Sequence, residues 1–98
     1  MKHILLLEDE ENLNRGIGLK LSKEGYQVFS AFTIKEAKAI FEKERIDLVI
    51  SDITLPDGNG LEFGRIVREK SNAVLIYLTA MDQEIDIVNG YDTGADDY

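Results

Sequence analysis

The sequence contains no cysteine. Without thiols there can be no disulfide framework, no thiolate zinc site and no cysteine nucleophile. Long apolar runs are missing as well, because the four residues from Ile4 to Leu7 are followed at once by the acidic run Glu8 to Glu11. Such a short run cannot form a signal peptide or a membrane span. We therefore expect a cytoplasmic protein that does not associate with a membrane.

Positive charge is scarce, above all toward the carboxyl end. Nineteen acidic residues against eleven basic ones give a net charge of −8. The last basic residue is Lys70, and the stretch from Asp82 to Tyr98 holds six acidic residues and no basic one. Non-specific binding to nucleic acid or to an anionic membrane would have to overcome this repulsion. The charge favours a cation or a basic partner.

Glycine-rich phosphate-binding motifs are absent too. The run Glu8 to Glu11 stands where a dinucleotide-binding protein would carry G-x-G-x-x-G, and no G-x-x-x-x-G-K-[ST] occurs. A direct dinucleotide site is thereby rejected. The length of 98 residues corresponds to one domain or part of one, which excludes a multidomain enzyme.

Strand-length apolar segments alternate with helical patterns along the chain. The apolar segments are 4–7, 48–50 and 74–78, with a weaker one at 26–31 that suits an edge strand. They show no polar alternation, which is typical of parallel strands buried on both faces. Apolar spacing and helix-end signals predict four helices. They lie over about 11–24, after the capping box Thr33 to Glu36, around the stripe Phe63, Ile66 and Val67, and over 82–94. This order predicts an α/β fold with a doubly wound parallel sheet.

One segment allows a second interpretation. The pairs Asp57-Gly58 and Asn59-Gly60 could form a hairpin turn. We favour a loop leading into a helix, because Phe63, Ile66 and Val67 follow at helical rather than alternating spacing.

Acidic and hydroxyl side chains stand where the predicted strands end. Glu8 and Asp9 follow the first strand, Asp52 ends the third and Thr79 follows the fourth. Ligands of open α/β sheets bind beyond the carboxyl ends of the strands. Three neighbouring carboxylates would repel one another unless a cation lay between them, and Mg²⁺ accepts such oxygen ligands. With the metal bound, one carboxylate could attack phosphorus and hold a phosphoryl group as an acyl phosphate.

These landmarks resemble the receiver domain of two-component response regulators. The resemblance rests on five features in the expected order, covering the whole chain: Glu8-Asp9, Asp52-Ile53-Thr54-Leu55-Pro56, Gly60, Leu78-Thr79-Ala80 and Gly94-Ala95-Asp96-Asp97-Tyr98. It implies a flavodoxin-like receiver fold with strand order 2-1-3-4-5. It also implies a signalling switch rather than a multiple-turnover enzyme, phosphorylated by a sensor histidine kinase and acting through an output domain, often a DNA-binding one, that lies outside this chain.

The same resemblance implies roles for individual residues. Asp52 would be the phosphoacceptor. Mg²⁺ would be held by Asp9 directly, by Glu8 through water, by Asp52 and by the backbone carbonyl of Thr54. Thr79 would turn its hydroxyl toward the phosphoryl group, and Tyr98 would be the aromatic side chain that swings inward with it.

The chain departs from the family pattern at its carboxyl end. Family members continue past the Tyr98 position to a lysine on the fifth strand and then to a fifth helix. Because the last lysine here is Lys70, no residue can be assigned to pair with the phosphate. We expect residues 1–98 to be a single receiver domain that is incomplete at its carboxyl end. The uncovered edge of strand 74–78 would then favour self-association into a dimer or small oligomer.

Simpler roles compete with each of these assignments. Asp9 could merely cap the first helix, Asp52 could be a turn residue, and Thr79 could be a strand-end or cap residue. His3 lies away from the carboxyl ends of the strands and is expected to be solvated or hydrogen-bonded rather than catalytic.

Two other functions compete with the signalling switch. An Mg²⁺-dependent phosphatase with an aspartyl-phosphate intermediate would carry an acidic residue two positions after its nucleophile, where this chain has Thr54. A non-catalytic interaction module is the other alternative, which the missing lysine makes plausible for this fragment.

Overall fold

The computed structural model describes residues 2–78. Along the chain the elements are β1 (His3–Leu7), α1 (Glu11–Lys23), β2 (Gln27–Ala31), α2 (Ile34–Lys43), β3 (Leu48–Asp52), β4 (Thr54–Leu55), β5 (Gly58–Asn59), α3 (Gly60–Lys70) and β6 (Val74–Leu78). The helix predicted over 82–94, together with Thr79 and Tyr98, lies outside the described residues. No helix within the described part has the length and apolar character needed to cross a bilayer.

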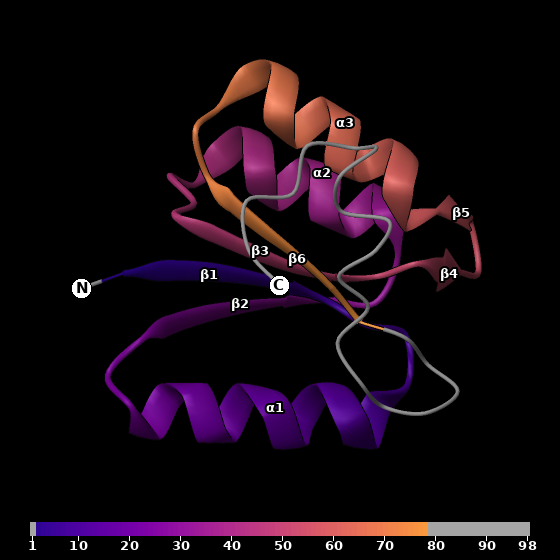
Figure 1. Ribbon diagram of the computed structural model, residues 1–98. Coiled ribbons are helices and arrows are strands. Elements are labelled where there is room, and N and C mark those ends of the chain that lie inside the picture. Colours follow the sequence, from indigo (N-terminus) through magenta and orange to yellow (C-terminus); the bar gives the residue numbers. More distant parts are fainter. Residues whose placement is uncertain (1, 79–98) are drawn as a thin grey trace.

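Four parallel strands form the main sheet in the order β2-β1-β3-β6 (Figure 1). In this register Ile4 of β1 lies between Val28 of β2 and Leu48 of β3. The predicted doubly wound parallel sheet is confirmed, and β2 is the edge strand that its mixed sequence indicated. The carboxyl ends of β1 and β3 are neighbours, which brings the residues after these strands to one edge of the sheet.

Helices cover both faces of the sheet. Helix α1 lies on one face, and α2 and α3 lie on the other (Figure 1). The larger core cluster, on the α2 and α3 side, includes Leu5, Leu7, Val49, Phe63 and Leu75, all at most 1% exposed. The smaller cluster lies under α1 and is built around Ile4, Leu6 and Ile50, with Ile17 and Leu21 packed against it. Because the apolar run of β1 serves both clusters, its alternate side chains are buried on opposite faces.

The ends of helix α1 are capped by its own flanking residues, but the N-terminal cap is not Asp9. Helix α1 is capped by Glu10, whose carboxylate accepts hydrogen bonds from the N–H groups of Asn12 (3.2 Å) and Leu13 (2.7 Å). Asp9 is therefore not the cap, and its carboxylate remains available for another role. At the other end Gly25 adopts φ +99° and its N–H donates to the carbonyl of Ser22, as expected for a helix-ending glycine.

The capping box of α2 is confirmed and is joined by a cap from a distant loop. Thr33 accepts from the N–H of Glu36, and the Glu36 carboxylate accepts from the N–H of Phe32. Asp57 accepts from the N–H groups of Ile34 (2.8 Å) and Lys35 (3.0 Å). These bonds lower the pKa of the Asp57 carboxyl below its ordinary value. The segment after β3 is thus tied to the first turn of α2.

Residues 54–59 form a short hairpin, with its turn at Pro56 and Asp57 rather than at Asp57-Gly58 or Asn59-Gly60, and the predicted helix follows it directly. Strands β4 and β5 pair antiparallel, with Thr54 opposite Asn59 and Leu55 opposite Gly58. Asn59 then caps α3 by accepting from the N–H of Leu61. Both interpretations of this segment are therefore partly right, because a two-residue ladder leaves the helical spacing from Phe63 onward intact.

Candidate metal centre

Glu8 follows β1 directly and is buried. Only 1% of the surface of this residue is exposed. One carboxylate oxygen, Oε2, accepts a hydrogen bond from the N–H of Glu10 (2.8 Å). The other, Oε1, is buried and has no hydrogen-bond partner among the described residues. A buried carboxylate oxygen without a donor is costly unless a proton or a cation satisfies it.

Asp52 is the last residue of β3 and is buried to the same degree, at 1% exposure. Its Oδ1 accepts from the N–H of the following residue, Ile53 (2.8 Å). Its Oδ2 is buried and, like Glu8 Oε1, has no hydrogen-bond partner in the described part of the chain. Two neighbouring strands therefore each deliver one unsatisfied carboxylate oxygen to the same edge of the sheet.

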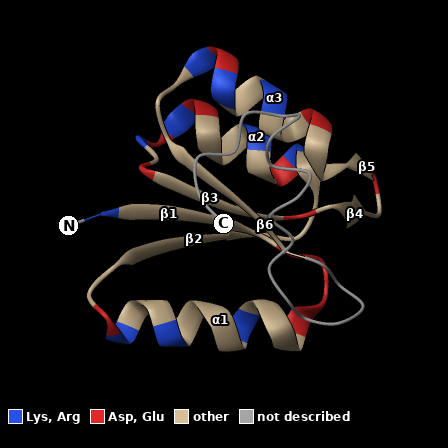
Figure 2. Cartoon of the chain, in the orientation of Figure 1, with Lys and Arg blue, Asp and Glu red and all other residues tan. Residues whose placement is uncertain are grey.

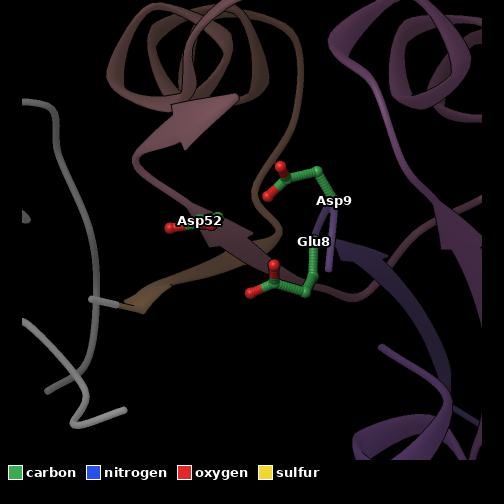
Figure 3. Close-up of side chains that lie close together, drawn as sticks. All are labelled: Glu8, Asp9 and Asp52. Carbon is green, nitrogen blue, oxygen red and sulfur yellow. The ribbon is translucent and has the colours of Figure 1, made fainter. Parts of the chain in front are cut away.

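Asp9 completes a group of three carboxylates. One oxygen from each of Glu8, Asp9 and Asp52 lies within 4.8 Å of the other two, and the three side chains lie close together in Figure 3. Asp9 is exposed, whereas the other two are buried. Figure 2 shows the acidic segments after β1 and at the end of β3 meeting at one edge of the sheet.

The donor set fits a hard divalent cation. All three ligating groups are carboxylates, and the exposed Asp9 leaves the cluster open to water. Mg²⁺ prefers a small number of carboxylates with several retained waters. The unsatisfied oxygens of Glu8 and Asp52 are the atoms that such an ion would satisfy. The sequence prediction that Glu8, Asp9 and Asp52 come together is confirmed by this geometry.

The loop after Asp52 is held tightly against β3. The exposed residue Thr54 begins β4, two residues beyond Asp52. The N–H of Gly60 donates to the carbonyl of Ile53 at 2.6 Å. A Cβ atom on Gly60 would overlap the carbonyl oxygen of Asp52 and would lie 2.9 Å from Ser51 Oγ. Glycine is therefore required here by a close approach between the start of α3 and the end of β3.

Burial and mutual repulsion both disfavour ionisation of the cluster. Burial raises the pKa of Glu8 from its ordinary 4.5 to about 7, and the charges of Asp52 and Asp9 add to this effect. Burial also raises the pKa of Asp52, with the charge of Asp9 contributing, while the N–H of Ile53 opposes the shift. A proton and a divalent cation should therefore compete for the same carboxylates.

This competition predicts how stability depends on pH in the metal-free protein. Because the pKa of Glu8 is higher in the folded than in the unfolded state, the folded state binds more protons, and stability falls as the pH rises from about 4.5 to 7. The change in the free energy of unfolding belongs to the linked carboxylates together, because the charges of Asp52 and Asp9 contribute to the pKa of Glu8. Urea denaturation in a chelator at pH 5 and pH 8 should show the difference, and Glu8→Gln should reduce it. If Glu8→Gln shows the same difference in stability between pH 5 and pH 8 as the parent, the difference does not come from Glu8.

Sequence reasoning missed one buried polar residue next to this site. Asn14 is 1% exposed, and its side-chain amide donates to the carbonyls of Glu8 (2.9 Å) and Ala31 (3.2 Å). A signal was present in the sequence, because Asn14 falls on the same face of α1 as Ile17 and Leu21. A polar residue on a buried stripe indicates a specific hydrogen-bond partner.

Comparison with known proteins identifies the family of the chain. The family model described as the response regulator receiver domain matches residues 4–98. The chain belongs to this family. The predicted metal ligands Glu8, Asp9 and Asp52 lie at the carboxyl ends of β1 and β3.

The chain is similar to regulators from several bacteria. It is 43% identical over 96 residues to the aerobic respiration control protein ArcA of Escherichia coli strain K12, covering 98% of this chain and 40% of that protein. It is 41% identical over 95 residues to the regulatory protein VanR of Enterococcus faecium, covering 97% of this chain and 41% of that protein. The chain thus spans about two fifths of the length of these relatives.

Solved structures show the same likeness. The response regulator TrrA of Thermotoga maritima, in a complex with Mg²⁺ and BeF, matches with a TM-score of 0.84 and 35% identity, covering 100% of this chain and 84% of that one. TrrA in complex with the histidine kinase ThkA matches with the same TM-score, identity and coverage. The flavodoxin-like receiver fold expected from the sequence is confirmed.

Proposed function

We propose that this chain is the phosphoacceptor domain of a signalling switch and that Asp52 receives the phosphoryl group from a phosphohistidine of a sensor histidine kinase. The single observation that carries the proposal is the cluster of Glu8, Asp9 and Asp52, with one oxygen of each within 4.8 Å. The family membership and the complex of TrrA with a histidine kinase support it.

The chemistry assigned to Asp52 is an in-line transfer. A carboxylate oxygen of Asp52 forms a bond to phosphorus as the bond from phosphorus to the histidine nitrogen breaks, and the imidazole leaves with that electron pair. The product is an acyl phosphate, which water later hydrolyses to the carboxylate and inorganic phosphate. The reaction modifies the protein itself, so we propose a switch rather than a multiple-turnover enzyme.

Four groups would hold the metal ion in this proposal. They are the carboxylates of Glu8, Asp9 and Asp52 and the backbone carbonyl of Thr54. When bound, Mg²⁺ supplies positive charge that offsets the charge of the incoming phosphoryl group. The N–H of Ile53 orients one oxygen of Asp52. The other oxygen is the one with no hydrogen-bond partner among residues 2–78.

Two further residues and the output complete the proposal. Thr79 would donate a hydrogen bond to the phosphoryl group and Tyr98 would change position with it, both as the family resemblance implies. The output would be transcriptional, through a domain outside this chain, consistent with the names of ArcA and VanR. DNA binding would belong to that domain, because this chain carries a net charge of −8.

A magnesium titration tests the proposed site. Mg²⁺ is expected to shift the amide resonances around Asp9 and Asp52 with a dissociation constant in the millimolar range, roughly 1–10 mM, because the site is open and keeps several waters. Asp52→Asn should weaken binding by removing one ligand charge. Asp57→Asn, a matched change at an exposed carboxylate of the adjacent hairpin, should leave the affinity unchanged. Absence of any shift up to about 50 mM, far above that range, would contradict the proposal.

We also propose that the 98-residue chain self-associates. Among the described strands β6 pairs only with β3, and Val74 at its start is 36% exposed. An apolar strand with an unpaired edge favours pairing with a second copy. Light scattering against concentration is expected to show a dimer or small oligomer. A monodisperse monomer at millimolar concentration would contradict this.

A further inference from the structure

Asn14 joins two strands and a helix beside the metal ligands. It lies near the start of α1, on the side that faces the sheet, and is 1% exposed. Its Nδ2 donates to the carbonyl of Glu8 at the end of β1 and to the carbonyl of Ala31 at the end of β2. A neutral amide is suited to this place because it supplies two donors without adding charge.

The hydrogen bond to Glu8 acts on the peptide group that carries Asp9. The carbonyl of Glu8 and the N–H of Asp9 belong to the same planar peptide unit, so fixing the carbonyl fixes that plane. The N–H of Glu8 donates to the carbonyl of Ala31 at 3.1 Å, and the N–H of Glu10 donates to Glu8 Oε2 at 2.8 Å. The backbone on both sides of Asp9 is therefore restrained, although Asp9 itself is exposed.

Such restraint is needed because the cluster repels itself. Three carboxylates with oxygens within 4.8 Å of one another favour separation whenever they are ionised together. Glu8 and Asp52 are held by burial, whereas the exposed Asp9 could relieve the repulsion by a rotation of its backbone. The buried amide of Asn14 opposes this rotation by holding the preceding carbonyl.

We propose that Asn14 is a positioning residue for the metal site: its amide fixes the peptide between Glu8 and Asp9 and so holds Asp9 in reach of the ion that Glu8 and Asp52 also bind. This inference rests on the proposed function, because it requires that the cluster binds Mg²⁺. Asn14 would then contribute to the affinity for Mg²⁺ as well as to the packing of α1.

The test compares Asn14→Leu with a destabilising core variant elsewhere. Leucine has the same number of side-chain heavy atoms and the same branching as asparagine but donates no hydrogen bond. The control is Val67→Ala, which disturbs the buried side of α3 and lowers stability without touching the cluster. Mg²⁺ affinity is measured in the full chain from amide shifts, at a temperature where each variant is folded. Asn14→Leu is expected to weaken binding about tenfold, as is typical of groups that orient metal ligands, and Val67→Ala to leave it unchanged.

Hydrogen exchange in the metal-free chain gives an independent readout. Loss of the Asn14 amide is expected to speed exchange at the amides of Asp9 and Glu10 more than in β3 or β6. Where Asn14→Leu does not fold, Asn14→Ser, which keeps one shorter donor, replaces it and is expected to bind with intermediate affinity. Equal Mg²⁺ affinity in the parent and the Asn14 variant would overturn the positioning role while leaving the proposed function intact. A parent chain that binds no Mg²⁺ would overturn the proposed function itself.

Discussion

Asp52→Asn is expected to abolish acceptance of a phosphoryl group. The substitution keeps the size of the side chain and one oxygen acceptor for the N–H of Ile53, but an amide oxygen is a poor nucleophile and carries no charge to hold the cation. Intact mass spectrometry after incubation with a small phosphodonor and Mg²⁺ measures the effect. Labelling of the parent is expected to be slow, because the phosphoryl group adds about 1.5 to 2 negative charges to an acidic cluster, which Mg²⁺ only partly offsets.

The matched control for this variant is Asp57→Asn. Asp57 is an exposed carboxylate five residues further along the chain, and it caps α2 instead of entering the cluster. Asparagine is also a good helix cap, so this variant is expected to remain folded and to be labelled like the parent. Labelling of Asp52→Asn at the parent's rate would show that another residue accepts the phosphoryl group.

Gly60→Ala is expected to lower the free energy of unfolding more than any other substitution proposed here. The added methyl group would overlap the backbone carbonyl of Asp52 and crowd Ser51 Oγ at 2.9 Å. Overpacking in a core typically costs about 1–3 kcal/mol, and the cost rises when the obstacle is backbone that cannot rotate away. We expect a loss of more than about 3 kcal/mol, a large part of the roughly 5–15 kcal/mol that stabilises a typical domain.

Gly16→Ala provides the matched control in α1. A Cβ atom on Gly16 would meet nothing within 4 Å, and alanine is favoured over glycine in a helix by up to about 1 kcal/mol. Chemical denaturation is therefore expected to show a neutral or stabilising effect for Gly16→Ala and a severe loss for Gly60→Ala. Similar midpoints for the two variants would contradict the close approach of α3 to the end of β3.

The elements that could be predicted from the sequence are those specified by local patterns. The run Ile4 to Leu7 has no polar alternation, and in the structure all four residues are fully buried. The capping box of Thr33 and Glu36 forms where its spacing indicated. The approach of Asp52 to Glu8 and Asp9 followed from one further rule, namely that neighbouring parallel strands end at the same edge of a sheet.

The features that could not be predicted depend on contacts between distant segments. Asp57 hydrogen-bonds to Ile34 and Lys35, which precede it by 23 and 22 residues. The need for glycine at position 60 depends on how closely α3 approaches β3. No local pattern contains either relation, because each depends on the packed positions of two elements. The β4–β5 hairpin is not predictable either, because two-residue strands carry too little alternation to be recognised.

The most direct test of the account is to locate the phosphoryl group and to show that it needs the metal. The chain is incubated with a small phosphodonor, with Mg²⁺ or with a chelator, and the acyl phosphate is trapped by borohydride reduction, which converts a phosphorylated aspartate to homoserine. Peptide mass spectrometry then identifies the residue. We expect homoserine at position 52 only, and only with Mg²⁺. Modification at another residue, or at Asp52 to the same extent in the chelator, would contradict it.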